Sequence, residues 1–270
     1  MELVKVYAIY FSPTGSTGRI AVAVAKGTGL QGAKIDLTAW RSRANYGRVF
    51  NRNEVVVVGC PVYNGRLPGK IDDFFGCLKG NQTPAVAIVV YGNRDYEDAL
   101  LELKNRLEER GFKVIAGGAF IGQHTFTENI AAGRPDDNDI FLAREFGRLA
   151  IANIDKAYNG TLTVRGKFPY EALPFDPTEL TGEYNGWAQV GTTADCSFCG
   201  QCEENCPWHA ITIDANVITN YSRCMRCFRC IKFCPAKAKK VIDPNFKDFV
   251  EMFEKDMEGR ISRPEMFFGQ

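Results

Sequence analysis

Eight of the ten cysteines follow one spacing that occurs twice. Each run reads C-x-x-C-x-x-C-x-x-x-C-P, and the second starts at Cys224, 28 residues after Cys196. Three thiolates on one tight loop can hold three corners of a cubane cluster, and the fourth ligand must come from elsewhere in the chain. The spacing therefore predicts iron–sulfur clusters, which move one electron at a time.

The doubled run resembles that of the bacterial two-cluster ferredoxins, in which the fourth cysteine of each run binds the other cluster. The proline after each fourth cysteine stops the local helix and turns the chain away. The resemblance implies two [4Fe–4S] clusters. Their expected ligands are Cys196, Cys199, Cys202 and Cys234 for one cluster, and Cys224, Cys227, Cys230 and Cys206 for the other.

Two other uses of these cysteines compete with this interpretation. A disulfide framework is typical of short secreted domains, whereas the first residues here show no signal-peptide pattern and lead directly into a predicted strand. Structural zinc sites mostly use separated C-x-x-C pairs or mixed cysteine and histidine ligands. Iron–sulfur ligation in the cytoplasm is the interpretation we favour, in an organism that avoids oxygen.

The length of 270 residues suits about two domains, and the hydrophobic content of 45% allows a sizeable core. No segment is long and apolar enough to span a membrane. The formal net charge is +1, which favours neither nucleic acid nor a membrane as a partner.

The chain up to about residue 160 alternates strand and helix signals. The predicted strands are residues 4–11, 33–37, 54–60, 84–91 and 112–120. The predicted helices are residues 19–26, 71–78, 96–110 and 139–158. Buried strands rich in β-branched residues, separated by helices, indicate a doubly wound parallel sheet of five strands.

Three loops follow strands of this predicted sheet, at the edge where such folds bind ligands. Residues 12–17 join a strand to a helix, so their backbone N–H groups can receive a phosphate, although a plain helix N-cap would use the same residue types. No lysine follows the glycine as a nucleotide-triphosphate loop requires. The other two loops are residues 61–68 and 91–96.

Thr14-Gly15-Ser16-Thr17 is similar to the phosphate-loop signature of flavodoxins, and the loop at 91–96 looks like the one that holds their flavin ring. The resemblance implies FMN, with Tyr63 and Tyr96 as candidates for stacking on the ring. Asn64-Gly65 suits a peptide that reorients beside the flavin, or else an ordinary tight turn. The expected FMN-binding residues are Ser12, Thr14, Gly15, Ser16, Thr17, Pro61, Tyr63, Asn64, Gly65, Tyr91, Gly92, Asn93 and Tyr96.

Several conspicuous residues receive no functional assignment. The G-x-G-x-x-G match at residues 27–32 follows a helix and precedes a strand, the reverse of the dinucleotide-binding order, so we interpret it as a helix stop. Cys60 and Cys77 are expected to be buried small hydrophobes. His209 follows a predicted cluster ligand and could tune its potential, but we expect it at the surface.

Four segments are expected: an FMN-binding domain at 1–160, an extended linker at 161–190, a two-cluster ferredoxin domain at 191–240 and a helical tail at 241–270. The linker's aromatic residues, including those of Leu173-Pro174-Phe175-Asp176-Pro177, predict that it packs on a domain. In the tail, apolar residues recur at helical spacing. The whole chain resembles the flavodoxin–ferredoxin fusion proteins of anaerobes: a flavodoxin-like α/β fold plus a small α+β ferredoxin domain.

This combination predicts an electron-transfer protein that relays single electrons between its clusters, FMN and external redox proteins. The alternative is an FMN-dependent reductase of a small molecule, with Tyr63, Tyr91, Arg66, Arg94 or His124 as the proton donor. The cluster segment is basic, which suggests an acidic docking partner near the second cluster, at Arg226 and Arg229. Its basic residues are Arg223, Arg226, Arg229, Lys232, Lys237, Lys239 and Lys240, against the acidic Asp195, Glu203, Glu204 and Asp214.

Overall fold

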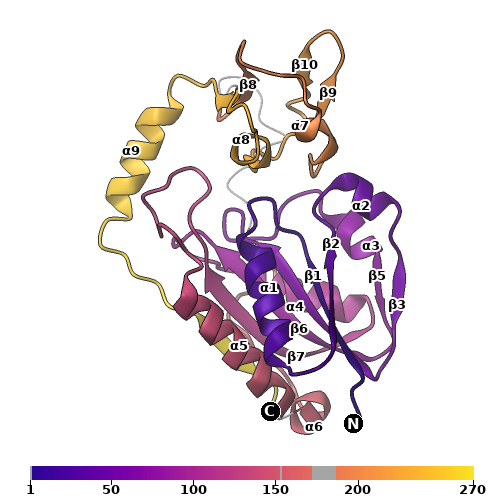
Figure 1. Ribbon diagram of the computed structural model, residues 1–270. Coiled ribbons are helices and arrows are strands. Elements are labelled where there is room, and N and C mark those ends of the chain that lie inside the picture. The colour runs from indigo at the N-terminus through magenta and orange to yellow at the C-terminus, as the bar shows by residue number, and fades with distance from the viewer. Residues whose placement is uncertain (1, 153, 172–186) are drawn as a thin grey trace.

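The computed structural model describes residues 2–152, 154–171 and 187–270, and a six-stranded sheet lies at its centre (Figure 1). Five of its strands are parallel: β1 (Lys5–Tyr10), β2 (Gly32–Asp36), β4 (Glu54–Pro61), β6 (Thr83–Tyr91) and β7 (Phe112–Ile121). Their spatial order is β7-β6-β4-β1-β2. Counted along the chain, this is the 2-1-3-4-5 order of the flavodoxin-like fold, so the predicted fold class and all five predicted strands are confirmed.

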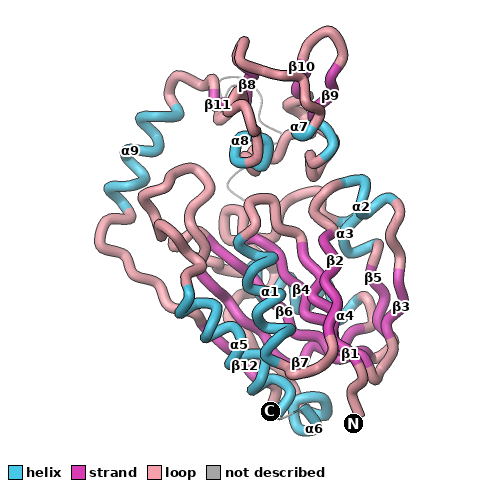
Figure 2. Tube along the Cα trace, viewed as in Figure 1, coloured by secondary structure: helices cyan, strands magenta, loops and turns pink. Residues whose placement is uncertain are grey.

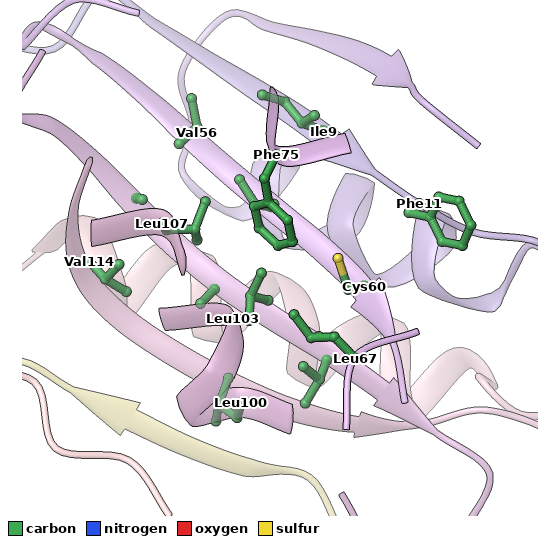
Figure 3. Close-up of a cluster of buried hydrophobic side chains, with 14 of the residues drawn as sticks. Ile9, Phe11, Val56, Cys60, Leu67, Phe75, Leu100, Leu103, Leu107 and Val114 are labelled. Atoms are coloured by element: carbon green, nitrogen blue, oxygen red, sulfur yellow. The ribbon is translucent and has the colours of Figure 1, made fainter. Parts of the chain in front are cut away.

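Helices cover both faces of the sheet. One face carries α1 (Ser16–Gly27), α5 (Asp137–Ala152) and α6 (Ile154–Asn159), and the other carries α3 (Asp72–Gly76) and α4 (Ala99–Glu109). Leucines of α4 pack against the strands in one apolar cluster, and Figure 3 labels Leu100, Leu103 and Leu107 among its members. Because both faces are covered, the residues of β6 are buried along its whole length, which explains its continuous apolar sequence.

The sheet has one element that the sequence analysis did not predict. After the expected tail helix, now α9 (Phe246–Asp256), the chain returns to the sheet and forms β12 (Glu265–Phe268). This strand pairs antiparallel with β7, and the backbones of Gln270 and Thr161 exchange two hydrogen bonds beyond it. The tail is therefore not only helical: its last residues form the sixth strand, at the edge of the sheet.

Short elements near the second sheet edge also differ from the prediction. The helix α2 (Trp40–Ala44) and the paired strands β3 (Arg48–Phe50) and β5 (Leu78–Gly80) lie between the predicted elements. Each has only three to five residues, too few for a periodic signal. The glycine-rich segment at 27–32 is the predicted helix stop, since α1 ends at Gly27 and β2 begins at Gly32.

The cysteine-rich segment forms a small separate unit above the carboxyl ends of the strands (Figure 2). It contains β8 (Val190–Thr192) paired with β11 (Lys239–Val241), and the hairpin of β9 (Ile211–Ile213) and β10 (Val217–Thr219). Two single-turn helices, α7 (Gln201–Glu204) and α8 (Arg229–Lys232), complete it. The described residues contain no helix long and apolar enough to cross a membrane.

The 28-residue sequence repeat is also a backbone repeat. Left-handed residues recur at equivalent places: Phe198 with Arg226, Gly200 with Phe228, and His209 with Lys237. The left-handed residue Gly200 directly precedes α7, and its counterpart Phe228 directly precedes α8. The two halves of the unit therefore share one local fold.

The described part of the linker packs on α4, as predicted. The carboxylate of Asp98 accepts hydrogen bonds from the backbone N–H groups of Lys167 and Glu171, and the hydroxyl of Tyr170 accepts one from Asn105. The predicted connector residues Leu173-Pro174-Phe175-Asp176-Pro177 lie outside the described residues.

Candidate redox site

The loop between β1 and α1 is built as an anion receptor. Gly15 adopts φ +95 at the N-cap of α1, and the Ser12 hydroxyl accepts a hydrogen bond from the Gly18 N–H at 2.9 Å. Across the part of the chain that is described, the N–H groups of Thr14, Ser16 and Thr17 donate to no other residue. Free N–H groups at a helix N-terminus can receive a phosphate, and the phosphate site in this loop stays a prediction.

The second loop contains a two-residue turn. The backbones of Tyr63 and Arg66 exchange hydrogen bonds of 2.8 and 3.0 Å, and the residues between them, Asn64 and Gly65, both have positive φ. This is the type I′ arrangement, for which Asn-Gly is the preferred pair. The tight turn and a reorienting peptide use the same residues, so both earlier interpretations of Asn64-Gly65 still stand.

A cavity of about 1010 Å³ lies between the three loops and the cysteine-rich unit. Its mainly apolar lining is typical of a cofactor site. Eight of the residues expected to bind FMN line it: Thr14, Ser16, Thr17, Pro61, Tyr63, Asn64, Tyr91 and Gly92. Ser12, Gly15 and Gly65 do not line this cavity, and Ser12 and Gly15 line a separate groove beside α1 instead.

The third loop corrects the sequence analysis at two residues. Tyr96 was expected to stack on the flavin, but its side chain is fully buried in the core beside α4 and donates a hydrogen bond to Glu265 at 2.8 Å. Asn93 is also buried, and its side-chain amide joins the loop to the tail at Arg260 and Ser262. Both residues fix the loop, and neither lines the cavity.

Several lining residues were missed by the sequence analysis. The loop after β7 contributes Gly122, Gln123, Thr125 and Phe126. The cysteine-rich unit contributes Trp187, Met225, Arg226 and Cys227. The residues after β7 follow the fifth parallel strand at the same sheet edge, so the strand order could have indicated them. The residues of the cysteine-rich unit reach the cavity only because the two units pack together, and no local sequence pattern marks them.

His124, considered as a proton donor, also lines this cavity. Its Nδ1 accepts a hydrogen bond from the Phe126 N–H at 3.2 Å, and its ring centroid lies 4.8 Å from that of Phe253 on α9. Burial, aided by the charge of Arg94, lowers the pKa of His124 to about 4. The imidazole is therefore neutral at pH 7 and is a poor acid there.

The second cavity, of about 850 Å³, is enclosed by the cysteine-rich unit, and all eight cysteines of the two runs line it. No three His, Cys, Asp or Glu side chains among the described residues converge as a single metal ion would require. The thiols of both runs instead surround one shared cavity. This fits multi-iron clusters, whose thiolates each bind a different iron.

Backbone donors around this cavity are placed for thiolates. The N–H of Ala210 donates to Cys206 Sγ at 3.2 Å, and the N–H of Ala238 donates to Cys234 Sγ at 3.3 Å. Burial raises the pKa of the Cys227 thiol well above its ordinary value. Hydrogen bonds of this kind stabilise a thiolate and tune the potential of a cluster.

The two units touch through side chains that flank the cysteines. Trp208 packs edge-on against Phe11 with ring centroids 5.2 Å apart, and His209 lies 4.3 Å from the ring of Trp40. The buried guanidinium of Arg43 donates to the backbone oxygens of Leu37 and Thr38 and also to Pro207 across the interface. His209 therefore lies at an internal contact, which corrects the expected surface position.

The arginines proposed for partner docking near the second cluster are not available for it. Arg226 is 3% exposed and donates to the backbone oxygens of Trp187 and Cys224. Arg229 donates to the backbone oxygens of Ser12 and Pro13, at 3.4 and 2.9 Å. Arg226 is therefore held within the cysteine-rich unit, and Arg229 joins that unit to the loop after β1, so the expected docking site at these two arginines is wrong.

The two remaining cysteines are structural, as expected. Cys60 is fully buried on β4, and burial raises the pKa of its thiol far above the ordinary value (Figure 3). The thiol of Cys77 donates to the Asp73 carbonyl at 3.1 Å. Neither is a reactive thiolate at neutral pH.

Comparison with known proteins gives one family match and several similar solved structures. A family model described as a 4Fe-4S binding domain matches residues 192–212. No curated protein matches the chain. Similar solved structures include a flavodoxin from the domain Archaea (14% identity, TM-score 0.39), flavodoxin 2 from Bacillus cereus (16%, 0.39) and a flavodoxin from Streptococcus pneumonia TIGR4 (17%, 0.38), each match covering 56% of this chain and 99% of the other.

Proposed function

Because the chain combines a flavodoxin-like sheet with a 4Fe–4S binding segment, we propose that it carries FMN and two [4Fe–4S] clusters and relays single electrons between them and external redox proteins. The observation that carries this proposal is that the two cavities share part of their lining. Met225 and Cys227 line both the cavity expected to hold FMN and the cavity expected to hold the clusters. A cluster bound by Cys227 would therefore adjoin the flavin, and fixing both in one chain raises their effective concentration.

The chain's own groups would hold each cofactor in place. The free N–H groups of Thr14, Ser16 and Thr17 would receive the FMN phosphate, and Tyr63 and Tyr91 supply aromatic walls. Arg229 fixes the backbone of this phosphate loop from the cluster side. FMN holds one or two electrons and each cluster normally passes one, so the bound pair would match two-electron to one-electron chemistry.

Two clusters, with the ligand sets expected from the sequence, are supported by the internal repeat. The family match covers only the first half of the unit, at 192–212. The second half repeats its left-handed residues and its N–H to sulfur hydrogen bond at Cys234. A binding loop copied at this level of detail is expected to bind a copy of the same cofactor.

An electron carrier is favoured over a small-molecule reductase because the cysteine-rich unit forms part of the wall of the flavin cavity. Phe126, Trp187 and Arg226 line it on the side of the cysteine-rich unit. A substrate stacked on the flavin would need that space, and the one histidine in the lining is neutral at pH 7. Electrons need no such opening.

For the partner surface, we propose a basic groove between α1, α5 and the cluster unit, of about 1040 Å³. Its exposed basic residues are Arg19, Lys26, Lys34 and Arg144. Within the described residues none of these forms an ion pair, and Asp36 is the acid in the lining. Arg229 and Phe233 line both this groove and the cluster cavity, so an acidic redox protein seated here would lie next to a cluster.

The proposal is tested by cofactor content and a reductive titration of the protein purified without oxygen. We expect about eight iron and eight acid-labile sulfide atoms per chain, and one FMN. Cys227→Ser should remove the signal of one cluster in EPR, whereas Cys60→Ser should leave both. The carrier role would be refuted if the protein binds iron but no FMN. It would also be refuted by saturable turnover of a small acceptor in the absence of a partner protein.

A further inference from the structure

Lys239 is an unusual residue for the wall of the cluster cavity. It lies on β11, is only 3% exposed, and lines the cavity together with the eight cysteines. Among the described residues its Nζ has no hydrogen-bond partner. An ammonium without a partner in a buried site is costly, which implies a negative charge nearby in the loaded protein.

The internal repeat provides a comparison within the same chain. Lys239 follows Cys234 by five residues, and Ile211 follows Cys206 by five residues in the first run. Both positions begin a three-residue strand, and both are 3% exposed. In the first half an apolar side chain fills this buried position, so packing alone does not require a lysine at the equivalent position of the second half.

Lys239 shares its cavity with cysteines from both runs. Cys202 belongs to one expected ligand set, Cys224 and Cys230 belong to the other, and all three line the same cavity as Lys239. The Lys239 side chain is therefore enclosed together with both sets.

We propose that Lys239 is a built-in counter-ion shared by the two clusters, and that it raises the reduction potential of both. Reduction adds one electron to a cluster and breaks no bond, so the reduced form is the more negative one. A fixed buried cation stabilises that form, because net charge is one of the factors that set cluster potentials. This inference rests on the proposed two-cluster function and adds a tuning residue to it.

The test is an EPR-monitored redox titration of the intact, loaded protein under anaerobic conditions. Lys239→Ile copies the residue at position 211 and should lower both cluster potentials. The expected size is at least a tenfold change in the ratio of reduced to oxidised cluster at a fixed potential, which corresponds to 59 mV for one electron. Lys239→Arg keeps the positive charge, so both cluster potentials should stay at their wild-type values.

Lys240→Met is the matched control, because Lys240 is the next residue on β11 and is exposed. It should leave both potentials unchanged. Equal shifts in Lys239→Ile and Lys240→Met, a shift in one cluster alone, or no shift would overturn the shared counter-ion. The iron and sulfide content of the wild-type protein tests the two-cluster proposal independently of these potentials. If Lys239→Ile fails to load, Lys239→Gln provides the same test with a polar side chain.

Discussion

The imidazole of His124 is held in its neutral form by its surroundings. It lines the flavin cavity, accepts a hydrogen bond from the Phe126 N–H, and faces the ring of Phe253. Arg94 adds a like charge to the cost of burial. Both effects disfavour the imidazolium, so protonation must weaken the folded state.

We therefore predict that stability falls as the pH drops from about 6.5 to about 4. The folded pKa of about 4 lies below the ordinary 6.5, so the unfolded chain binds more protons in this window and stability rises with pH. The loss is about 2 kcal/mol, allowing for the partial exposure of the ring. Urea unfolding at several pH values measures it.

His124→Asn is the informative variant, because an amide oxygen can accept the Phe126 N–H without titrating. Its stability should depend less on pH within this window. His209→Asn serves as the control, since the chain has only two histidines. A wild-type pH dependence that survives in His124→Asn would contradict the assignment.

Single residues were the least predictable part of the site. The loop after β6 was located from the sequence, yet Tyr96 points into the core and Tyr91 lines the cavity. Sequence order gives the position of a loop but not the direction of each side chain within it. Arg226 shows a related limit, because a charged residue was assumed to be solvated and is instead buried against backbone oxygens.

At the scale of elements, the edge strand β12 protects the sheet. It covers the outer edge of β7, and Phe268 packs on Phe146 of α5 with ring centroids 5.3 Å apart. An uncovered strand edge offers unpaired N–H and C=O groups to other chains. The tail therefore stabilises a domain from which it is separated by more than 100 residues.

We predict that Phe268→Ala lowers the free energy of unfolding by about 2–3 kcal/mol, because it removes a large aromatic contact. Phe141→Ala is the control, because Phe141 lies on α5, the helix that Phe268 contacts, but is 60% exposed and should cost less than about 0.5 kcal/mol. Urea unfolding compares the two. Equal losses would mean that β12 contributes nothing to the sheet.

Truncation after residue 264 should have a second effect. The exposed edge of β7 is expected to pair with other chains, so the truncated protein should form soluble oligomers in size-exclusion chromatography. A truncated chain that stays monomeric and as stable as the wild type would show that β12 is dispensable.

The sequence predicted long elements well and short or distant ones poorly. The run Val55-Val56-Val57-Val58 of β4 is recognisable because a strand buried on both faces has to be apolar throughout. β12 has four half-buried residues, and its partner β7 lies more than 100 residues away in the chain, so no local pattern marks it. The repeat in the cysteine-rich unit was predicted because thiolate geometry dictates the spacing.

At the scale of the whole molecule, function depends on how the two units meet. Arg43 reaches from the sheet to Pro207, and Arg229 reaches from the cluster unit to the phosphate loop. These contacts bring Cys227 to the wall of the flavin cavity. Arg226 is buried by this arrangement, whereas Arg19, Lys26, Lys34 and Arg144 of the proposed groove are exposed.

The last prediction concerns that groove. Lys34→Glu should slow reduction of the protein by a purified, dithionite-reduced acidic ferredoxin about tenfold at low salt, because steering by opposite charges raises association rates. Arg144→Glu should act in the same direction. Stopped-flow absorption at several salt concentrations measures the rates, and the difference from wild type should vanish at high salt.

Lys79→Glu is the matched control for Lys34→Glu, since both are exposed strand lysines and Lys79, on β5, lies outside the groove. The control should keep the wild-type rate and salt dependence. Equal slowing in both variants would assign the effect to net charge alone. NADPH is the alternative ligand, because its phosphates and an acidic protein surface bind the same cations. If NADPH reduces the flavin directly and Lys34→Glu abolishes this reaction, the groove binds a dinucleotide instead. Unchanged rates in both groove variants would move the docking site elsewhere on the cluster unit, where the exposed ring of Phe198 adjoins Cys199.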